Sequence, residues 1–465
     1  MSALSHAGAT RRTIGASAIG AAAGLALGLA AGWLSARASG GLAHVRWGGL
    51  APASSAPRAV SFLPPTGPVA ARLRELDRIL AEMRPGDPSG AAALLARARL
   101  FLDAARSPAL ALADVERLLA DHPCAHEAAG ALYLRVEALL HAGALPAAQD
   151  AARRFLAAFP ASWRAPDAAT LGADLLLARA RSAEAEALLG DALETYTGSK
   201  PRTAAGLLDR CACSAPAALI LMRLGRLALA SGDFASAEGA FEYVARPVVT
   251  AAGCGETCIE SPFLAEARVG LAEVALHMGG ERESGAREAL ARLARRYERS
   301  PAGRRARLAA GLPERMPGGR ALALAEAGRL DDAARAAVRS PPAGEAADAL
   351  AGILEARAFL DPRGVLALAD RIGPAGLPLR ARESLIIGRA HALEAIGRAR
   401  EADAALGRYS SERLALARAE LARRRGYGKD VRSTLELAAS SSDLAAALLE
   451  RERAGPQGAR GEASP

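Results

Sequence analysis

The chain contains few aromatic residues and almost no lysine. Phe, Trp and Tyr make up 4% of its 465 residues, and Lys200 and Lys429 are the only lysines. No basic run is interleaved with aromatic side chains on which bases could stack, and the arginines lie among carboxylates at the i,i+4 spacing of solvated helix faces. The composition therefore argues against a nucleic-acid partner, despite a net charge of +9.

Strand signals are also scarce, whereas helix formers are abundant. Ala, Leu, Arg and Glu dominate nearly every segment after position 70. Runs of β-branched residues bounded by turn residues, which indicate strands, are nearly absent. The sequence predicts an all-α fold.

Catalytic motifs are missing as well. The sequence has no P-loop, no dinucleotide fingerprint, no HExxH motif and no signature of a Ser or Cys nucleophile. The "DHPCAH" stretch places His122, Cys124 and His126 within five residues, which fits a metal-ligand set or, as we expect, a proline-broken loop between helices. We expect that the protein is not an enzyme and that it binds no cofactor or metal. The alternative is an enzyme whose site no motif reveals.

A long charge-free segment stands near the amino end. Ile14–Leu34 is 21 residues long, enough to cross about 30 Å of hydrocarbon at about 1.5 Å per residue. We expect the chain to divide into an N-terminal segment (1–12), a transmembrane helix or signal anchor (13–36), a proline-rich linker (37–69), a helical domain (70–450) and a disordered tail (451–465).

The alternative is a cleaved export signal, because Ala36-Arg37-Ala38 has the small-x-small form of a cleavage site. Against cleavage, the apolar stretch is longer than the usual signal core. Arg11 and Arg12 favour an amino end that stays inside. The expected location is the inner membrane, single-pass, with the C-terminal domain in the periplasm, or else export after cleavage near Ala38.

Glycines recur at every fourth position within this segment, at Gly20, Gly24, Gly28 and Gly32. On a helix they share one face, where a second helix can approach closely in a membrane. The pattern predicts self-association or contact with a partner helix, although abundant glycine also produces such spacing by chance.

Beyond the linker, the sequence reads as pairs of short helices. The clearest unit is "APAALILMRLGRLALASGDFASAEGAFEYVA", Ala215–Ala245. Gly225 lies within its first helix, Gly232 makes the turn, and Ala237 and Phe241 follow on the second helix. Small residues at Gly225 and Ala237 let the helices approach, while Phe241 fills the space between this pair and its neighbour. Weaker copies cover most of residues 90–440.

This unit resembles the tetratricopeptide repeat, in the form found in membrane-anchored or exported bacterial proteins. The resemblance implies an α-solenoid whose first helices line a concave groove that binds peptides or proteins. By their offset from each turn glycine, the residues expected to face that groove are Tyr133, Glu137, His141, Met222, Arg226, His391 and Glu394.

Four cysteines directly precede the first helices of two neighbouring repeats, at Cys211, Cys213, Cys254 and Cys258. A helical hairpin returns the chain to its starting edge, so both pairs are expected on one edge. In an oxidising compartment we expect one or two disulfides between the two loops, with a zinc site or free thiols as alternatives and Cys124 unpaired.

The sequence thus predicts a membrane-anchored scaffold or adaptor of the bacterial cell envelope with protein or peptide partners. An export or folding helper that holds unfolded clients is the alternative from a second functional class.

Overall fold

A computed structural model of the chain describes residues 69–83, 87–160, 162–197, 215–245, 263–408 and 411–454, and these are helical with no strand among them. The all-α prediction is confirmed for this part of the chain. The helices are α2 (Val69–Glu82), α3 (Pro88–Asp103), α4 (Pro108–Asp121), α5 (Ala128–His141), α6 (Leu145–Ala158), α7 (Ala165–Leu177), α8 (Ser182–Thr197), α9 (Ala215–Ser231), α10 (Phe234–Ala245), α11 (Leu264–Met278), α12 (Glu281–Arg296), α13 (Pro301–Ala309), α14 (Gly319–Glu326), α15 (Leu330–Arg339), α16 (Gly344–Arg357), α17 (Pro362–Ile372), α18 (Leu379–Ala395), α19 (Ala399–Gly407), α20 (Glu412–Arg424), α21 (Gly428–Ala439) and α22 (Asp443–Ala454).

The predicted membrane segment 13–36 and the four cysteines expected to form disulfides lie outside the described residues. Within the described ranges, no helix combines the length and the apolar character that crossing a membrane requires. The last helix ends at Ala454. Arg451 is therefore helical, although the sequence predicted that the tail begins at this residue.

Several helices begin at a capping residue followed by proline. The Asp87 carboxylate accepts a hydrogen bond from the Ser89 amide at 3.0 Å, and the Asp361 carboxylate accepts one from the Gly364 amide at 3.0 Å. Each carboxylate satisfies an amide that has no partner within the helix. The proline that follows already has a helical φ and lacks an amide hydrogen to satisfy, so the local sequence fixes where α3 and α17 start.

Tight turns join the two helices of a hairpin through a left-handed residue. Gly232, between α9 and α10, has a φ of 83°. The turn between α7 and α8 places Ala180 at the same position, two residues before the second helix, with a φ of 57°. An alanine in this region is strained, because its Cβ crowds the backbone. The turn that lacks a glycine in the sequence therefore keeps the same geometry.

The repeat register predicted from Ala215–Ala245 is confirmed by the packing of Phe241. A Cβ atom added to Gly225 in α9 would lie 2.7 Å from the Phe241 ring, and one added to Gly270 in α11 would lie equally close. Both Phe241 and Ala237 are fully buried. One aromatic ring thus fills the space between its own hairpin and the next, which two glycines make available.

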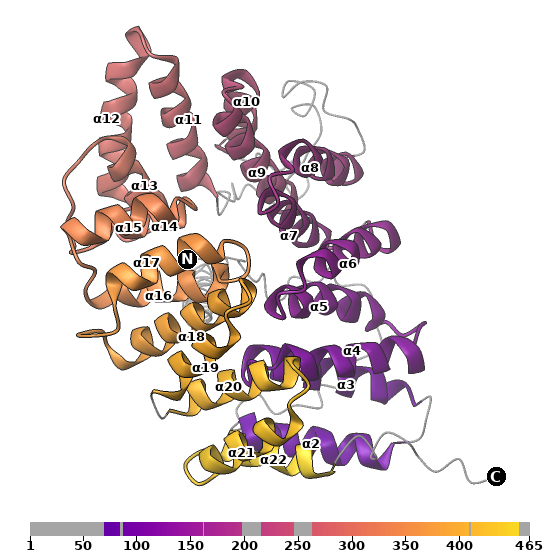
Figure 1. Ribbon diagram of the computed structural model, residues 1–465. Helices are drawn as coiled ribbons and strands as arrows, with labels where there is room; N and C mark the ends of the chain where they lie inside the picture. Colours follow the sequence, from indigo (N-terminus) through magenta and orange to yellow (C-terminus); the bar gives the residue numbers. More distant parts are fainter. Residues whose placement is uncertain are drawn as a thin grey trace, which may run out of the picture. The chain divides into compact units, whose positions relative to one another are not determined.

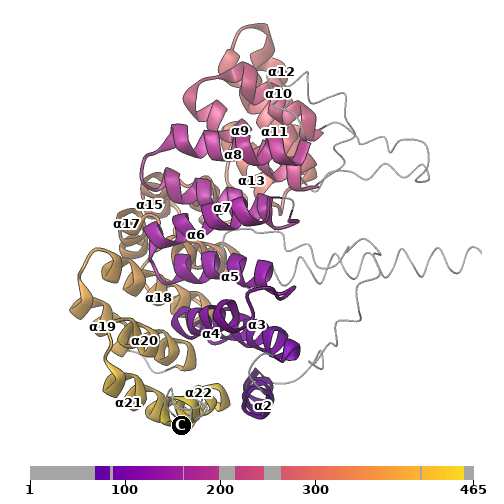
Figure 2. The same cartoon turned by 90° about the vertical axis from the view of Figure 1, so that its right-hand side faces the viewer.

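Each hairpin packs on the next along the chain, as Figures 1 and 2 show. The order of contacts changes between α15 and α18. Here α15 packs on α17 and α16 packs on α18, and both contacts are more extensive than the contact between α16 and α17. At Gly388 in α18 a Cβ atom would lie 2.8 Å from the backbone nitrogen of Glu355 in α16. Glycine is therefore required for the close approach of these two first helices.

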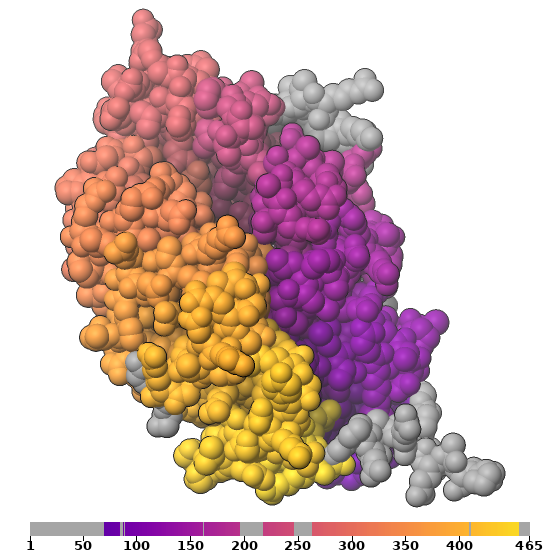
Figure 3. Space-filling view, in the orientation of Figure 1, coloured from indigo at the N-terminus to yellow at the C-terminus, as the bar shows by residue number. Residues whose placement is uncertain are grey.

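The two ends of the array are in contact. Helix α2 packs on α22, and α4 packs on α20. One apolar core is shared by the two ends and includes Leu76 and Phe101 from the first helices and Leu435 and Leu448 from the last. Figure 3 shows the last helices lying against the first ones. We call this region the end-to-end contact.

Candidate functional site on the first helices

The seven residues predicted to face a groove all lie on the first helix of a hairpin. Tyr133, Glu137 and His141 are on α5, Met222 and Arg226 on α9, and His391 and Glu394 on α18. Tyr133 and Met222 are almost fully buried, with 1% and 3% exposure, whereas His141 is exposed. The partner-binding role of these residues stays a prediction.

An arginine and two carboxylates surround Tyr133. The Arg164 guanidinium lies 4.5 Å from the centre of the Tyr133 ring and 4.3 Å from that of Trp163. Burial raises the pKa of Tyr133, and the charge of Glu137 acts in the same direction. Burial also raises the pKa of Asp167 to about 6, although Arg164 opposes the shift. The start of α7 therefore holds a carboxylate that is partly protonated near neutral pH.

A second group joins His391 to the turn after α5. The Phe359 ring stacks on His391 at 5.2 Å and meets the backbone at Gly143, where a Cβ atom would lie 2.5 Å from the ring. The Arg424 guanidinium lies 5.1 Å from the Phe359 ring and donates to the carbonyl oxygen of His141 at 2.7 Å. These contacts join α5 to α18 and α20.

His391 is held neutral in this group. Burial lowers its pKa well below the usual range. Nearby cationic side chains also lower this pKa, and Arg424 has the largest effect among them. Its Nε2 atom is buried and has no hydrogen-bond partner within the described part of the chain. His391 therefore packs as a neutral ring against Phe359.

The other predicted residues lie in the core or in ion pairs. Met222 belongs to an apolar core formed by α7 to α11. Arg226 pairs with Glu266 of α11, and each side chain is 33% exposed. Glu394 accepts a hydrogen bond from Arg425 at 3.0 Å. Arg226 and Glu394 are thus both paired within the chain. The partner of Arg226 lies on another helix, and the partner of Glu394 lies in the turn after α20.

Ion pairs of this kind continue along consecutive first helices. Besides Arg226–Glu266, the pairs are Arg223–Asp174 between α9 and α7, Arg305–Glu273 between α13 and α11, and Arg304–Glu326 between α13 and α14. Their side chains are between 11% and 33% exposed. We call these four pairs the ion-pair row. Arg304 and Arg305 each contact both carboxylate oxygens of their partner, and such bidentate contact adds geometric specificity to a pair.

A buried carboxylate at the end-to-end contact was not predicted. Glu420 in α20 is 1% exposed and accepts a hydrogen bond from the Ser107 hydroxyl at 2.7 Å. Arg423 and Arg424 also donate to it, at 2.9 and 3.2 Å. Burial lowers the pKa of Arg424, which Glu420 opposes. In the sequence, "ERLALARAELARRR" gives no sign that one glutamate among several charged residues is buried.

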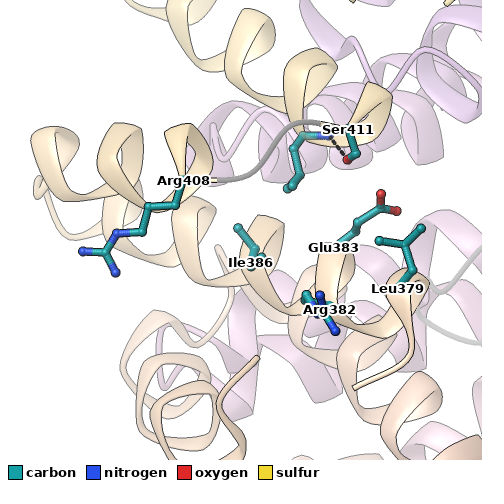
Figure 4. Close-up of a pocket in the computed structure, with 7 residues that line it drawn as sticks. Leu379, Arg382, Glu383, Ile386, Arg408 and Ser411 are labelled. Atoms are coloured by element: carbon teal, nitrogen blue, oxygen red, sulfur yellow. Dashed lines mark hydrogen bonds between the residues drawn. The ribbon is translucent and has the colours of Figure 1, made fainter. Parts of the chain in front are cut away.

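A pocket of about 310 Å³ lies between the first turns of α18 and α20. Figure 4 shows the side chains that line it, with the Arg408 guanidinium extending away from the others. Leu379, Ile386 and Leu414 supply apolar surface, while Arg382, Glu383 and Ser411 supply polar groups. The Ser411 hydroxyl accepts a hydrogen bond from the Leu414 amide at 3.4 Å and so caps α20. The arrangement offers room for one apolar side chain bordered by charge.

The "DHPCAH" stretch forms the connection between α4 and α5. Cys124 is exposed and not in a disulfide. No group of three His, Cys, Asp or Glu side chains suited to a metal ion occurs in the described ranges.

Fold and site together define the described part of the chain as an all-α repeat protein built of stacked helical hairpins. No protein-family model and no curated protein matches the sequence. Among solved structures, the chain is similar to the crystal structure of a tetratricopeptide repeat protein from Parabacteroides merdae. The two are 14% identical, with 70% of this chain and 99% of that chain covered and a TM-score of 0.25.

Proposed function

We propose that the chain is a scaffold or adaptor of the bacterial cell envelope that binds protein or peptide partners through its first helices. Residues 13–36 tether it to the inner membrane, and the helical domain lies in the periplasm. The observation that carries the proposal is the ion-pair row, because it presents four half-buried arginine–carboxylate pairs on successive first helices.

The chemistry of this row favours a partner with charged groups of its own. A charged group of the partner can replace one member of a pair. The displaced member then pairs with a second, oppositely charged group of the partner. A purely apolar segment of an unfolded client would instead remove the remaining water from these pairs, and this desolvation cost can exceed the attraction within each pair. The row therefore supports an adaptor more than a holder of unfolded clients.

Photo-crosslinking in cells tests this proposal. A photoreactive residue placed at Arg226, in the ion-pair row, should capture one stoichiometric partner, and the same residue at Leu437, which is 78% exposed on α21, should not. The charge reversal Arg223→Glu should reduce partner recovery, whereas Arg154→Glu on the exposed face of α6 should not. Capture of many unfolded proteins would support the folding helper, and equal capture from both positions would contradict a role for the row.

The membrane tether and the compartment have separate tests. Intact-mass measurement of native protein should show the full amino end, and a chain that begins near Ser39 would identify a cleaved signal. The double change Gly24→Ile and Gly28→Ile should weaken helix association in a membrane assay, because it removes close backbone approach while increasing hydrophobicity. Thiol counting on unreduced protein should show that Cys211, Cys213, Cys254 and Cys258 include at least one disulfide, whereas five free thiols would argue against export.

A further inference from the structure

The positive charge of the described chain is concentrated in one segment. Residues 289–325 contain nine arginines against two glutamates, a net charge of +7 in a chain whose total is +9. This segment covers the second half of α12, all of α13 and all of α14 except its last residue, Glu326. The sequence suggested that the arginines are scattered over solvated helix faces. Their concentration in this segment shows that they are not spread evenly.

Some of these arginines are compensated by carboxylates. Arg304 and Arg305 pair with Glu326 and Glu273, which lie outside the segment. Arg315, in the loop after α13, lies 2.5 Å from Glu298, which ties that loop to the end of α12.

Three exposed arginines at the end of α12 have no carboxylate within ion-pair distance in the described part of the chain: Arg295, Arg296 and Arg299. Some exposed arginines on other helices have one, such as Arg78 with Glu82 and Arg398 with Glu401, and others, such as Arg418 and Arg432, do not within the described ranges. The end of α12 differs because it places three such arginines within five positions. A cation in the last turn of a helix is favoured by the helix dipole, which accounts for one or two of the three. We call these three residues, together with Arg315, the arginine patch.

The chemistry of the patch suits a surface of fixed anions. The apolar residues in the last turns of α12 face the core, because Leu290 and Ala294 are fully buried and Leu293 is partly buried. The patch therefore offers mainly guanidinium groups. The nearby aromatic ring, Tyr297, is partly buried and lies under Arg296 at 5.6 Å, which leaves no row of rings for stacking nucleic-acid bases. Phosphate groups accept the paired N–H donors of arginine, and an anionic bilayer presents many of them in a plane.

We propose that the arginine patch rests on the anionic headgroups of a phospholipid bilayer. The inference rests on the proposed tether, which keeps the domain near a membrane: a linker of residues 37–69 gives a mean span of roughly 30 Å. The interaction acts within a Debye length of about 8–10 Å, so the tether strengthens it by keeping the patch near the surface.

Arginine labelling of the full chain tests the proposal. The protein is placed in nanodiscs of phosphatidylcholine, with or without phosphatidylglycerol, and is treated with phenylglyoxal, which modifies accessible guanidinium groups. Peptide mass spectrometry then gives the labelled fraction of each arginine. We expect labelling of Arg295, Arg296 and Arg299 to fall about fivefold when phosphatidylglycerol is present, and to recover in high salt. Arg418 and Arg432, exposed on α20 and α21, are the reference residues and should label equally in both lipids.

Equal labelling of the patch in the two lipids would overturn the proposal. Protection by soluble poly-glutamate, with none by phosphatidylglycerol, would also overturn it and would identify a surface for an acidic protein. Retention of the chain in the nanodiscs tests the tether separately. If the chain is not retained, flotation of the released protein with phosphatidylglycerol vesicles decides the patch: the triple variant Arg295→Glu, Arg296→Glu, Arg299→Glu should lose binding, and the double variant Arg418→Glu, Arg432→Glu should keep it.

Discussion

The guanidinium of Arg451 in α22 lies 2.8 Å from the carboxylate of Asp77 in α2, a residue 374 positions earlier in the chain. The same carboxylate accepts a hydrogen bond from Arg97, whose side chain is buried with Asp114. The guanidinium groups of Arg97 and Arg451 both lie over the Phe101 ring, at 5.9 and 4.9 Å from its centre. The end helices of the array thus share both an apolar core and a charge network.

A double-mutant cycle on Arg451 and Asp77 should give a measurable coupling. Their side chains are 26% and 37% exposed, so we expect about 1 kcal/mol of coupling in the free energy of unfolding, measured with urea for Arg451→Gln, Asp77→Asn and the double variant. The exposed pair Arg78–Glu82 within α2 is the control, with a smaller expected coupling. Zero coupling for Arg451 and Asp77 would mean that this ion pair does not form in solution.

Removal of the Glu420 carboxylate should destabilise the protein strongly. Glu420→Ala leaves the Arg424 guanidinium without its carboxylate in a buried position, and the Ser107 hydroxyl loses its acceptor. We expect a loss of about 3–5 kcal/mol in thermal or urea unfolding. Glu436→Ala, which breaks the exposed pair with Arg453, should cost less than about 1 kcal/mol. Similar losses for both variants would contradict the buried position of Glu420.

Adding one methyl group should distinguish two helical glycines. Gly225→Ala places a Cβ 2.7 Å from the Phe241 ring, so the helices must separate, which costs about 1–3 kcal/mol. Gly285→Ala, in α12, meets no atom within 4 Å and should stabilise the protein by up to about 1 kcal/mol, because alanine favours the helix. Melting temperatures of the two variants should move in opposite directions. A shift in the same direction would show that the repeat register around Phe241 is wrong.

These cases also show what the sequence could and could not predict. The unit Ala215–Ala245 was predictable because Gly225, Gly232 and Phe241 lie within 17 positions and their spacing alone defines the hairpin. The contact between Arg451 and Asp77 was not, because it depends on small rotations that accumulate over every hairpin between them. Tyr133 and Met222 were placed on the correct helices. Their burial depends on neighbouring helices, which an offset from a turn glycine cannot reveal.

The turn at Ala180 should become more stable with glycine. Because Ala180 has a φ of 57°, its Cβ is strained in the folded state, and Ala180→Gly removes a cost of about 1–2 kcal/mol. Glycine also makes the unfolded chain more flexible, which takes back about 0.5–1 kcal/mol. We expect a net gain of about 0.5–1 kcal/mol in urea unfolding. The reverse substitution Gly232→Ala, at the equivalent turn with a φ of 83°, should destabilise. A loss of stability in Ala180→Gly would show that this turn is not left-handed.

Asp167 should make the stability of the domain depend on pH. Its folded pKa of about 6 lies above the usual value near 3.8, because burial disfavours the charged carboxylate. Between these two values the folded state binds more protons than the unfolded state, so stability should fall as the pH rises from about 4 to about 6. Asp167→Asn removes this titration. The variant should match the wild type near pH 4 and exceed it at pH 7 by up to about 3 kcal/mol, less to the extent that water reaches the side chain. Urea unfolding at the two pH values measures the difference. If Asp167→Asn were instead less stable than the wild type at pH 7, the interaction of Asp167 with Arg164 would outweigh its burial, and the carboxylate would be fully ionised at the start of α7.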